Sequence, residues 1–228
     1  MKPYYDDGKG IVIYHGDCRE ILPTLASVDD LVLVTDPPYG VGLENSSGSG
    51  GQHGLVKGAY LSYVDSYENF LSSVIPALAV CVKICRRGLV FTGPHIWEQP
   101  KATAIGGIYC PAGAGRHQWG FKTFLPVLLY GVAPNLHKGA QPNTIASSEP
   151  AEKNGHPCPK PLGWMKWAVG LASMPHETVL DPFMGSGTTL RAAKDLGRRA
   201  IGIEIEEKYC EVAARRLSQE VLQLGGAS

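Results

Sequence analysis

Apolar residues occur in short runs that alternate with amphipathic segments along most of the chain. Runs rich in β-branched residues predict strands at 11–15, 31–35, 88–92, 124–130, 178–181 and 199–204, with a short one near Ile108. Apolar positions at helical spacing predict helices at 18–25, 65–85, 159–172, 186–196 and 206–223, the second kinked at Pro76. Strands that alternate with helices are typical of an α/β fold.

Two stretches lack this periodicity. Residues 40–58 hold seven glycines and three serines, a composition that cannot bury apolar surface. We expect a flexible loop at 41–60, either a lid over a neighbouring site or a slack surface loop. Residues 131–157 are rich in Gly, Pro, Asn, Ser and Lys and have the length of a binding insert. The chain is therefore read as one domain, 1–228, that carries two loop excursions.

Composition places the chain among globular proteins. It is 44% apolar and 18% charged, long enough for one large core, and its N-terminus lacks the apolar segment of a signal peptide. We expect no membrane-spanning run. The six cysteines are scattered, mostly within apolar runs, which favours reduced, buried thiols over disulfides or a metal site. These features predict a cytoplasmic protein without a metal.

Charge is unevenly distributed although the formal net charge is zero. Residues 101–170 carry seven Lys and Arg against two acidic residues, Glu149 and Glu152. This local excess is a modest indication of contact with phosphates, and solvated loop lysines would produce the same pattern.

The stretch Asp36-Pro37-Pro38-Tyr39 directly follows the predicted strand at 31–35. The two prolines hold the backbone extended and present a carboxylate, carbonyl oxygens and a ring where open α/β sheets bind ligands. Hydrogen-bond acceptors beside a ring suit a planar substrate that donates hydrogen bonds, such as a nucleobase with an exocyclic amino group. An ordinary diproline turn is an equal alternative on this motif alone.

A second motif, Asp-Pro-Phe-Met-Gly-Ser-Gly-Thr-Thr at 181–189, joins a strand to a helix through a glycine loop. Gly185 and Gly187 would let the backbone approach a ligand. The next strand ends at Glu204, where nucleoside-binding α/β domains place the acidic residue that binds the ribose hydroxyls. Position 190 is Leu, so the third glycine of a dinucleotide fingerprint is missing. This favours a nucleoside cofactor without pyrophosphate, a description that fits S-adenosylmethionine.

Asp17 also follows a predicted strand. Its carboxylate would either bind the cofactor or cap the helix that follows, and the helix cap is favoured on general grounds.

These motifs together resemble the DNA amino-methyltransferases, S-adenosylmethionine-dependent enzymes that methylate adenine N6 or cytosine N4. A third segment, His-Pro-Cys-Pro-Lys-Pro at 156–161, is similar to a family segment that lines the methionine pocket. The order of the motifs, catalytic first and cofactor loop last, is the permuted order of the beta class. The resemblance covers roughly residues 11–217, and members of this small size are often carried by phages and prophages.

The resemblance implies a Rossmann-like, seven-stranded, mostly parallel sheet with helices on both faces and one antiparallel strand, which we assign to 124–130. It also implies catalytic roles for Asp36, Pro37, Pro38 and Tyr39. Residues expected to bind S-adenosylmethionine are Asp17, Lys160, Asp181, Phe183, Gly185, Gly187, Thr188 and Glu204. One departure is Leu125, where family members often carry Glu, so no catalytic residue is expected in that strand.

The implied substrate is double-stranded DNA whose target base is flipped out of the duplex. Tyr39 would stack on the base, while Asp36 and the Pro37 carbonyl would accept its amino hydrogens. Asp at the head of the motif favours adenine N6 by family habit. Target recognition would fall to the short insert at 131–157, so either recognition is relaxed and brief or the loops at 41–60 and 93–118 share it. A homodimer is a further expected partner, because dimers are frequent in the class.

Other functions stay open. Cytosine N4 is the main alternative target, and RNA, a protein amide or an inactive DNA-binding remnant are weaker ones. A cytosine-C5 enzyme would place its Pro-Cys after the cofactor loop, whereas Pro157-Cys158 precedes it. A nicotinamide oxidoreductase would need the complete dinucleotide fingerprint.

Overall fold

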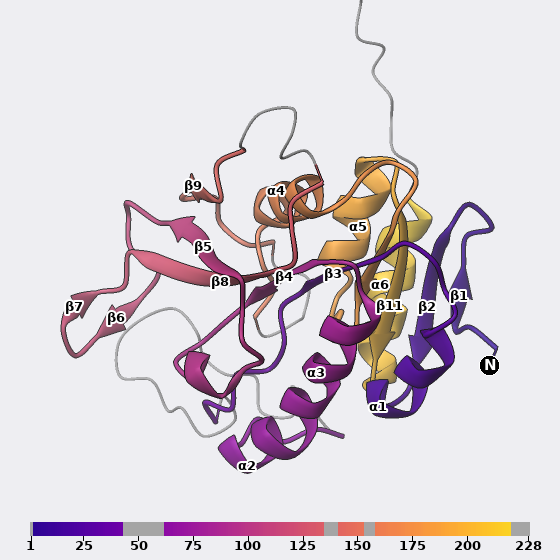
Figure 1. Cartoon of the computed structure of the whole chain (residues 1–228), viewed down its shortest axis with the longest axis horizontal. Helices are drawn as coiled ribbons and strands as arrows, with labels where there is room; N and C mark the ends of the chain where they lie inside the picture. Colours follow the sequence, from indigo (N-terminus) through magenta and orange to yellow (C-terminus); the bar gives the residue numbers. More distant parts are fainter. Residues whose placement is uncertain (1, 43–61, 135–140, 153–157, 220–228) are drawn as a thin grey trace, which may run out of the picture.

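The protein is described by a computed structural model at residues 2–42, 62–134, 141–152 and 158–219. Its centre is a twisted sheet (Figure 1). In spatial order the described strands of this sheet are β1 (Tyr5–Asp6), β2 (Ile11–His15), β11 (Arg199–Glu204), β10 (Thr178–Asp181), β3 (Leu31–Thr35), β4 (Gly88–Phe91), β8 (Phe124–Tyr130), β5 (Ala104–Tyr109) and β9 (Thr144–Ala146).

The directions of the strands confirm the predicted α/β class. Strands β2, β11, β10, β3 and β4 run parallel, and β8 runs antiparallel to both β4 and β5. The seven strands from β2 to β5 thus contain one reversed strand, at the predicted place. Two short strands at the outer edges, β1 and β9, were not predicted, because two and three residues are too few for a periodic pattern.

Helices cover both faces of the sheet (Figure 1). The described helical segments are α1 (Cys18–Ile21) with η1 (Leu22–Leu25), α2 (Tyr67–Asn69), η2 (Phe70–Val74), α3 (Ile75–Ile84), η3 (Ile96–Glu98), α4 (Leu162–Ala172), α5 (Thr188–Asp195) and α6 (Glu207–Ser218). Alternate residues of β3 enter different cores: Val32 packs in the core that includes α4, α5 and α6, and Leu33 in the core that includes α1 and α3. Such a strand reads as a continuous apolar run because both faces are buried.

The helix predicted at 65–85 is continuous from Tyr67 to Ile84 but changes geometry beside Pro76. Residues 70–74 form a π-helical segment, and α3 begins immediately before the proline. Because Pro76 has no N–H group, the change of helix type takes the place of the predicted kink.

The same helix also bears on the expectation that no segment could span a membrane. Among the described residues, Tyr67–Ile84 alone is long and apolar enough to cross a membrane, judged by length and composition only. One face of it, with Phe70, Val74 and Leu78, is buried in the protein core. A core helix of a globular protein passes the same test.

Other boundaries differ slightly from the prediction. Helix α4 begins at Leu162 rather than 159, since Pro159 and Pro161 precede it. Helix α5 begins at Thr188, after Gly187 in the left-handed conformation. The flexible loop predicted at 41–60 lies almost entirely outside the described residues, as do parts of 131–157 and the end of the helix predicted at 206–223.

Candidate active site

The carboxyl ends of β2, β3, β10 and β11 meet at a cavity of about 370 Å³. Each strand is followed by a segment that contributes to the wall, and the helical segment at 67–74 and residues 158–160 close the cavity from other sides. Predicted site residues in the lining are Asp17, Asp36, Pro37, Pro38, Tyr39, Lys160, Phe183, Gly185 and Glu204. Segments far apart in sequence therefore share one pocket.

The carboxylate of Asp36 is held by two side chains. Its Oδ1 accepts a hydrogen bond from the Tyr39 hydroxyl, and its Oδ2 lies 2.5 Å from Nζ of Lys160. Both members of this ion pair are largely shielded from solvent, and the ammonium also lies 5.3 Å from the centroid of the Tyr39 ring. The negative charge of Asp36 is thus balanced inside the cavity by a cation that comes from a distant part of the chain.

Burial is the main cause of a Tyr39 pKa well above the ordinary 10, and the neighbouring Asp36 carboxylate raises it further. The hydroxyl therefore stays protonated and serves as a hydrogen-bond donor to Asp36. The Tyr39 side chain also packs against the backbone of Gly93. A Cβ atom at position 93 would lie only 2.8 Å from Cβ of Tyr39, so only glycine fits there without a shift. The ring position depends on both contacts.

Asp65 fixes the backbone that follows the diproline motif, a role that the sequence did not reveal. This buried carboxylate accepts hydrogen bonds from the backbone N–H groups of Gly40, at 2.7 Å, and Val41, at 3.3 Å. It also lines the cavity. Nothing in the local pattern distinguishes Asp65 from an ordinary residue at a helix start, so only the folded structure identifies it.

Asp181 lies beneath the cavity and not in its lining. The carboxylate is buried and accepts hydrogen bonds from the Thr35 hydroxyl, at 2.6 Å, and the Phe183 backbone N–H, at 3.2 Å. Burial raises its pKa to about 6, although these hydrogen bonds act in the opposite direction. The bond between Asp181 and Thr35 joins β10 to β3 one residue before Asp36. Asp181 therefore supports both motifs.

Glu204 lines the cavity at the end of β11. Its two oxygens accept hydrogen bonds from the backbone N–H groups of Gly185, at 2.9 Å, and Glu206, at 2.8 Å. Burial raises the pKa of Glu204 to about 7, the two backbone hydrogen bonds lower it, and the negative charges of Glu206 and Asp181 add to the rise. The carboxylate thus fixes the glycine loop and faces the cavity.

Gly187 and Thr188 lie outside the lining of the cavity, in contrast to the roles expected for them. A Cβ at Gly187 would lie 2.8 Å from Cβ of Ala213, and the φ of Gly187 is 76°. The hydroxyl of Thr188 accepts a hydrogen bond from Arg216 at 3.1 Å. Both residues therefore secure the packing of α5 against α6, and Gly185 is the glycine of the loop that borders the cavity.

Asp17 has the helix-capping role favoured from the sequence. It caps α1 by accepting the Arg19 backbone N–H at 2.8 Å and forms an ion pair with the Arg19 guanidinium at 2.5 Å. The hydrogen bond from the guanidinium is the main cause of its lowered pKa. Asp17 also lines the cavity, so a cofactor contact remains geometrically open.

The described residues contain no cluster of three or more His, Cys, Asp and Glu side chains arranged to hold a metal ion. Of the family-like segment 156–161, residues 156 and 157 lie outside the described residues. Cys158 and Lys160 line the cavity.

The carboxyl edge of the α/β sheet thus unites the acidic diproline motif with the glycine loop, as the resemblance to the DNA amino-methyltransferases implies. Residues 88–215, more than half of the chain, match the family model described as DNA methylase. The chain belongs to this DNA methylase family, whose members methylate N6 or N4 amino groups. The predicted enzyme class, an S-adenosylmethionine-dependent DNA amino-methyltransferase, is confirmed.

Individual relatives cover nearly the whole chain. The type II methyltransferase M.ScaI of Streptomyces caespitosus is 25% identical over 98% of this chain and 86% of its own length. The PvuII DNA methyltransferase, described as cytosine-N4-specific, superposes with a TM-score of 0.69 at 16% identity, over 98% of this chain and 91% of that one. The complex of M1.HpyAVI with S-adenosylmethionine superposes with a TM-score of 0.61 at 22% identity, over 90% of this chain and 98% of that one.

Proposed function

We propose that this protein transfers a methyl group from S-adenosylmethionine to the exocyclic amino group of a base flipped out of duplex DNA, with adenine N6 as the preferred acceptor. The observation that carries the proposal is that Asp36, Phe183 and Glu204, at the ends of three parallel strands, line one cavity. Direct transfer requires donor and acceptor in one pocket, because the reacting atoms must meet at near contact distance.

The residues around the cavity fit S-adenosylmethionine. The volume of about 370 Å³ lies within the usual range for small-molecule sites. Gly185 and Phe183 offer a bare backbone and an aromatic wall, and the Glu204 carboxylate offers lone pairs to ribose hydroxyls. Lys160 would meet the methionine carboxylate. When bound, the cofactor supplies a methyl group activated by a positively charged sulfur.

Asp36 and the Pro37 carbonyl are the proposed acceptors for the two amino hydrogens of the base. A carboxylate has about four lone-pair positions, so Asp36 can accept an amino hydrogen while keeping Tyr39 and Lys160. These two hydrogen bonds would draw the amino nitrogen out of conjugation with the ring, so that its lone pair forms the new N–C bond as the S–C bond breaks and the sulfur leaves as a neutral thioether. They would also offset the positive charge that develops on the nitrogen, which then releases one proton to solvent. The Tyr39 ring, whose hydroxyl is already satisfied by Asp36, would stack on the base.

Substitution of Asp36 tests this proposal. Asp36→Ala should abolish incorporation of labelled methyl groups into DNA while the cofactor dissociation constant changes far less, because among the proposed cofactor contacts named above only Lys160 is paired with Asp36. The matched control is Asp6→Ala, an acidic residue of the edge strand β1 that does not line the cavity. Undiminished turnover in Asp36→Ala would remove Asp36 from the reaction.

Cytosine N4 is the second candidate, because the PvuII enzyme that superposes on this chain is described as cytosine-N4-specific. Both amino groups present the same donors, so the cavity contacts named above serve either base. Mass spectrometry of nucleosides from methylated DNA distinguishes the two: N6-methyladenine supports our assignment, and N4-methylcytosine replaces it.

A further inference from the structure

A hairpin extends from the sheet between β5 and β8 (Figure 1). The ladder between these strands ends at the pair Tyr109 and Phe124, and hydrogen bonds then continue from the Cys110 N–H to the Thr123 carbonyl, at 2.7 Å, and from the Ala114 N–H to the Lys122 carbonyl, at 2.6 Å. The end is the short antiparallel pair β6 (Arg116–His117) and β7 (Gly120–Phe121). Residues 110–123, called the finger below, are therefore an ordered outgrowth of the sheet.

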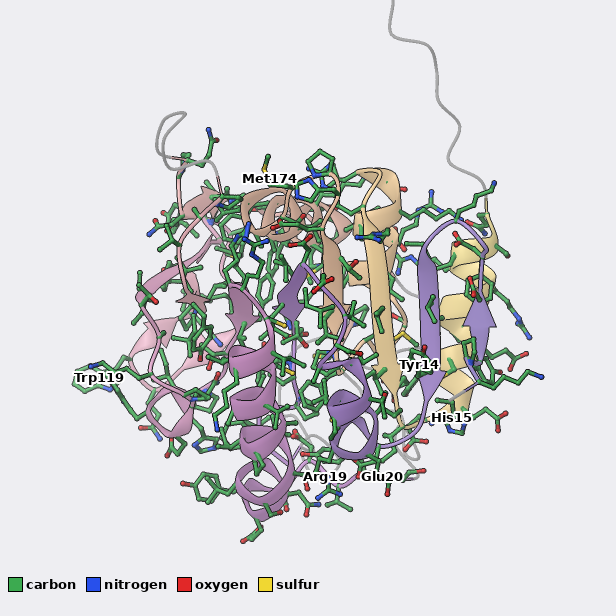
Figure 2. All side chains as sticks on the ribbon, turned by 45° about the vertical axis from the view of Figure 1, so that its right-hand side comes forward. Tyr14, His15, Arg19, Glu20, Trp119 and Met174 are labelled. Atoms are coloured by element: carbon green, nitrogen blue, oxygen red, sulfur yellow. The ribbon has the colours of Figure 1, made fainter. Side chains whose placement is uncertain are left out.

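Two large aromatic side chains of the finger are exposed. Trp119 occupies the two-residue turn between β6 and β7 and is 93% exposed, and Phe121 is 70% exposed. Figure 2 shows the Trp119 indole projecting away from the body of the protein. Exposed apolar groups of this size mark surfaces that bind a partner when they cluster, and Tyr109 and Phe124 at the base of the finger are also exposed.

The base of the finger adjoins the acceptor end of the cavity. Because β8 is reversed, its first residues lie at the same sheet edge as the carboxyl ends of β3 and β4. Lys122, near the base, has a lowered pKa, mainly from burial and also from the positive charge of Lys160. Lys160 is the residue whose ammonium lies 2.5 Å from Asp36. The finger thus begins beside the point where the target base would be held.

The charge of the surrounding sequence suits a polyanion. From Gln99 to Ser148 the chain contains no Asp or Glu but four basic residues, and this range includes β5, the finger, β8 and β9. A stretch without carboxylates offers no charge that would repel nucleic acid phosphates.

We propose that the finger enters the DNA duplex beside the target base pair and that Trp119 stacks in the space left by the flipped base. This inference rests on the proposed function. Flipping is opposed by lost pairing and stacking, and an aromatic ring inserted between base steps restores part of the stacking. A tryptophan at the end of a short two-stranded support can reach into a base stack without deforming the sheet.

Comparison of duplex and single-stranded substrates tests the inference. Trp119→Ala should lower kcat/KM on long unmethylated duplex DNA about tenfold or more, and leave kcat/KM on the same DNA after heat denaturation within about twofold of wild type. Trp119→Phe should recover much of the duplex rate. The control is Tyr4→Ala, an aromatic residue 40% exposed at the opposite edge of the sheet, which should leave both rates unchanged. Equal losses on both substrates, or no loss on duplex, would overturn the inference.

A binding measurement separates this inference from the proposed function. In a Trp97→Phe background Trp119 is the most exposed indole, and its fluorescence should be quenched when duplex DNA is added. Quenching without methylation would defeat the proposed function and leave the finger supported. Methylation without quenching would defeat the finger alone. Size-exclusion chromatography tests a third outcome. If the wild type is a dimer and Trp119→Ala is a monomer, the finger binds a second copy of the chain instead of DNA.

Discussion

The carboxylate of Asp36 is held differently from the carboxylates of Asp181 and Glu204. On the acceptor side, Asp36 is paired with the Lys160 ammonium at 2.5 Å. On the cofactor side, Glu204 is held by backbone N–H groups and Asp181 by hydroxyls and one N–H, and the pKa values of both are raised by burial. A buried carboxylate without a cation is open to a positively charged ligand, whereas a paired one is already fixed. The comparison indicates a rigid acceptor side and a cofactor side completed by its ligand.

Removal of the cation on the acceptor side should have the largest effect. Lys160→Met keeps an unbranched apolar stem but removes the ammonium, which leaves Asp36 without its counter-ion and free to change position. We expect kcat to fall about 10²-fold, because misplacement of a reacting group by about 1 Å has an effect of that size. Single-turnover methylation assays measure this. Lys166→Met, in an ion pair on α4 away from the cavity, is the control and should retain activity.

A methyl group at Gly187 should be the most damaging change on the cofactor side. Gly187→Ala would bring Cβ to 2.8 Å from Ala213 and force a left-handed φ on alanine. We expect unfolding free energy to fall by about 2–4 kcal/mol, the sum of overpacking and backbone strain. Urea denaturation measures the loss. Gly170→Ala, where an added Cβ meets nothing within 4 Å, should not destabilise the protein, and equal losses in both would contradict the packing role.

The raised carboxyl pKa values predict how pH affects stability. Folding raises the pKa of Asp181 from 3.8 to about 6 and of Glu204 from 4.5 to about 7, so between these values the native state binds more protons than the unfolded state. The free energy of unfolding contributed by these groups is therefore greatest below pH 4 and declines as pH rises to about 7. Urea titrations of wild type and Glu204→Gln between pH 5 and 8 should show a flatter profile in the variant.

Affinity for the cofactor should depend on pH in the opposite direction to the free energy of unfolding. If Glu204 receives the ribose hydroxyls, its ionised form is the better acceptor, and affinity for S-adenosylmethionine should increase between pH 5 and 7.5. Calorimetric titration at several pH values measures the slope. An equally steep increase in Glu204→Gln would place the titrating group elsewhere.

The smallest effect should come from the bond that joins the two sides. Thr35→Val removes the hydroxyl that donates to Asp181 and keeps the shape of the side chain. Stability should fall by about 1–3 kcal/mol, since a buried acceptor loses one of its partners. The more specific readout is kcat, which should fall while the cofactor dissociation constant changes less, because Thr35 directly precedes Asp36. Unchanged kcat would reduce the bond to a purely structural role.

Some features of the fold and of the cavity could be predicted from the sequence, and others could not. Strands such as Leu31–Thr35 were predictable because burial on both faces leaves a continuous apolar run. The motif residues Asp36 and Glu204 were found because strand ends in α/β sheets collect ligand groups. Asp65 and the bond between Thr35 and Asp181 depend on contacts between distant segments, which no local pattern encodes. The close approach of Gly187 to Ala213 could not be predicted either, because a glycine that approaches a ligand and one that approaches a helix have the same sequence signature.

The reversed direction of β8 has a consequence for how specificity can change. Because β8 is antiparallel to β5, the connection between them stays at one edge of the sheet, the edge that carries the cavity. Two parallel neighbours would instead need a crossover connection that returns to the opposite edge. Residues exchanged or inserted at this turn alter what the enzyme meets outside the pocket and leave the sheet ladder unchanged. If the finger enters DNA as proposed, turns grafted from related enzymes at positions 110–123 would change its contact with DNA and leave the sheet ladder unchanged.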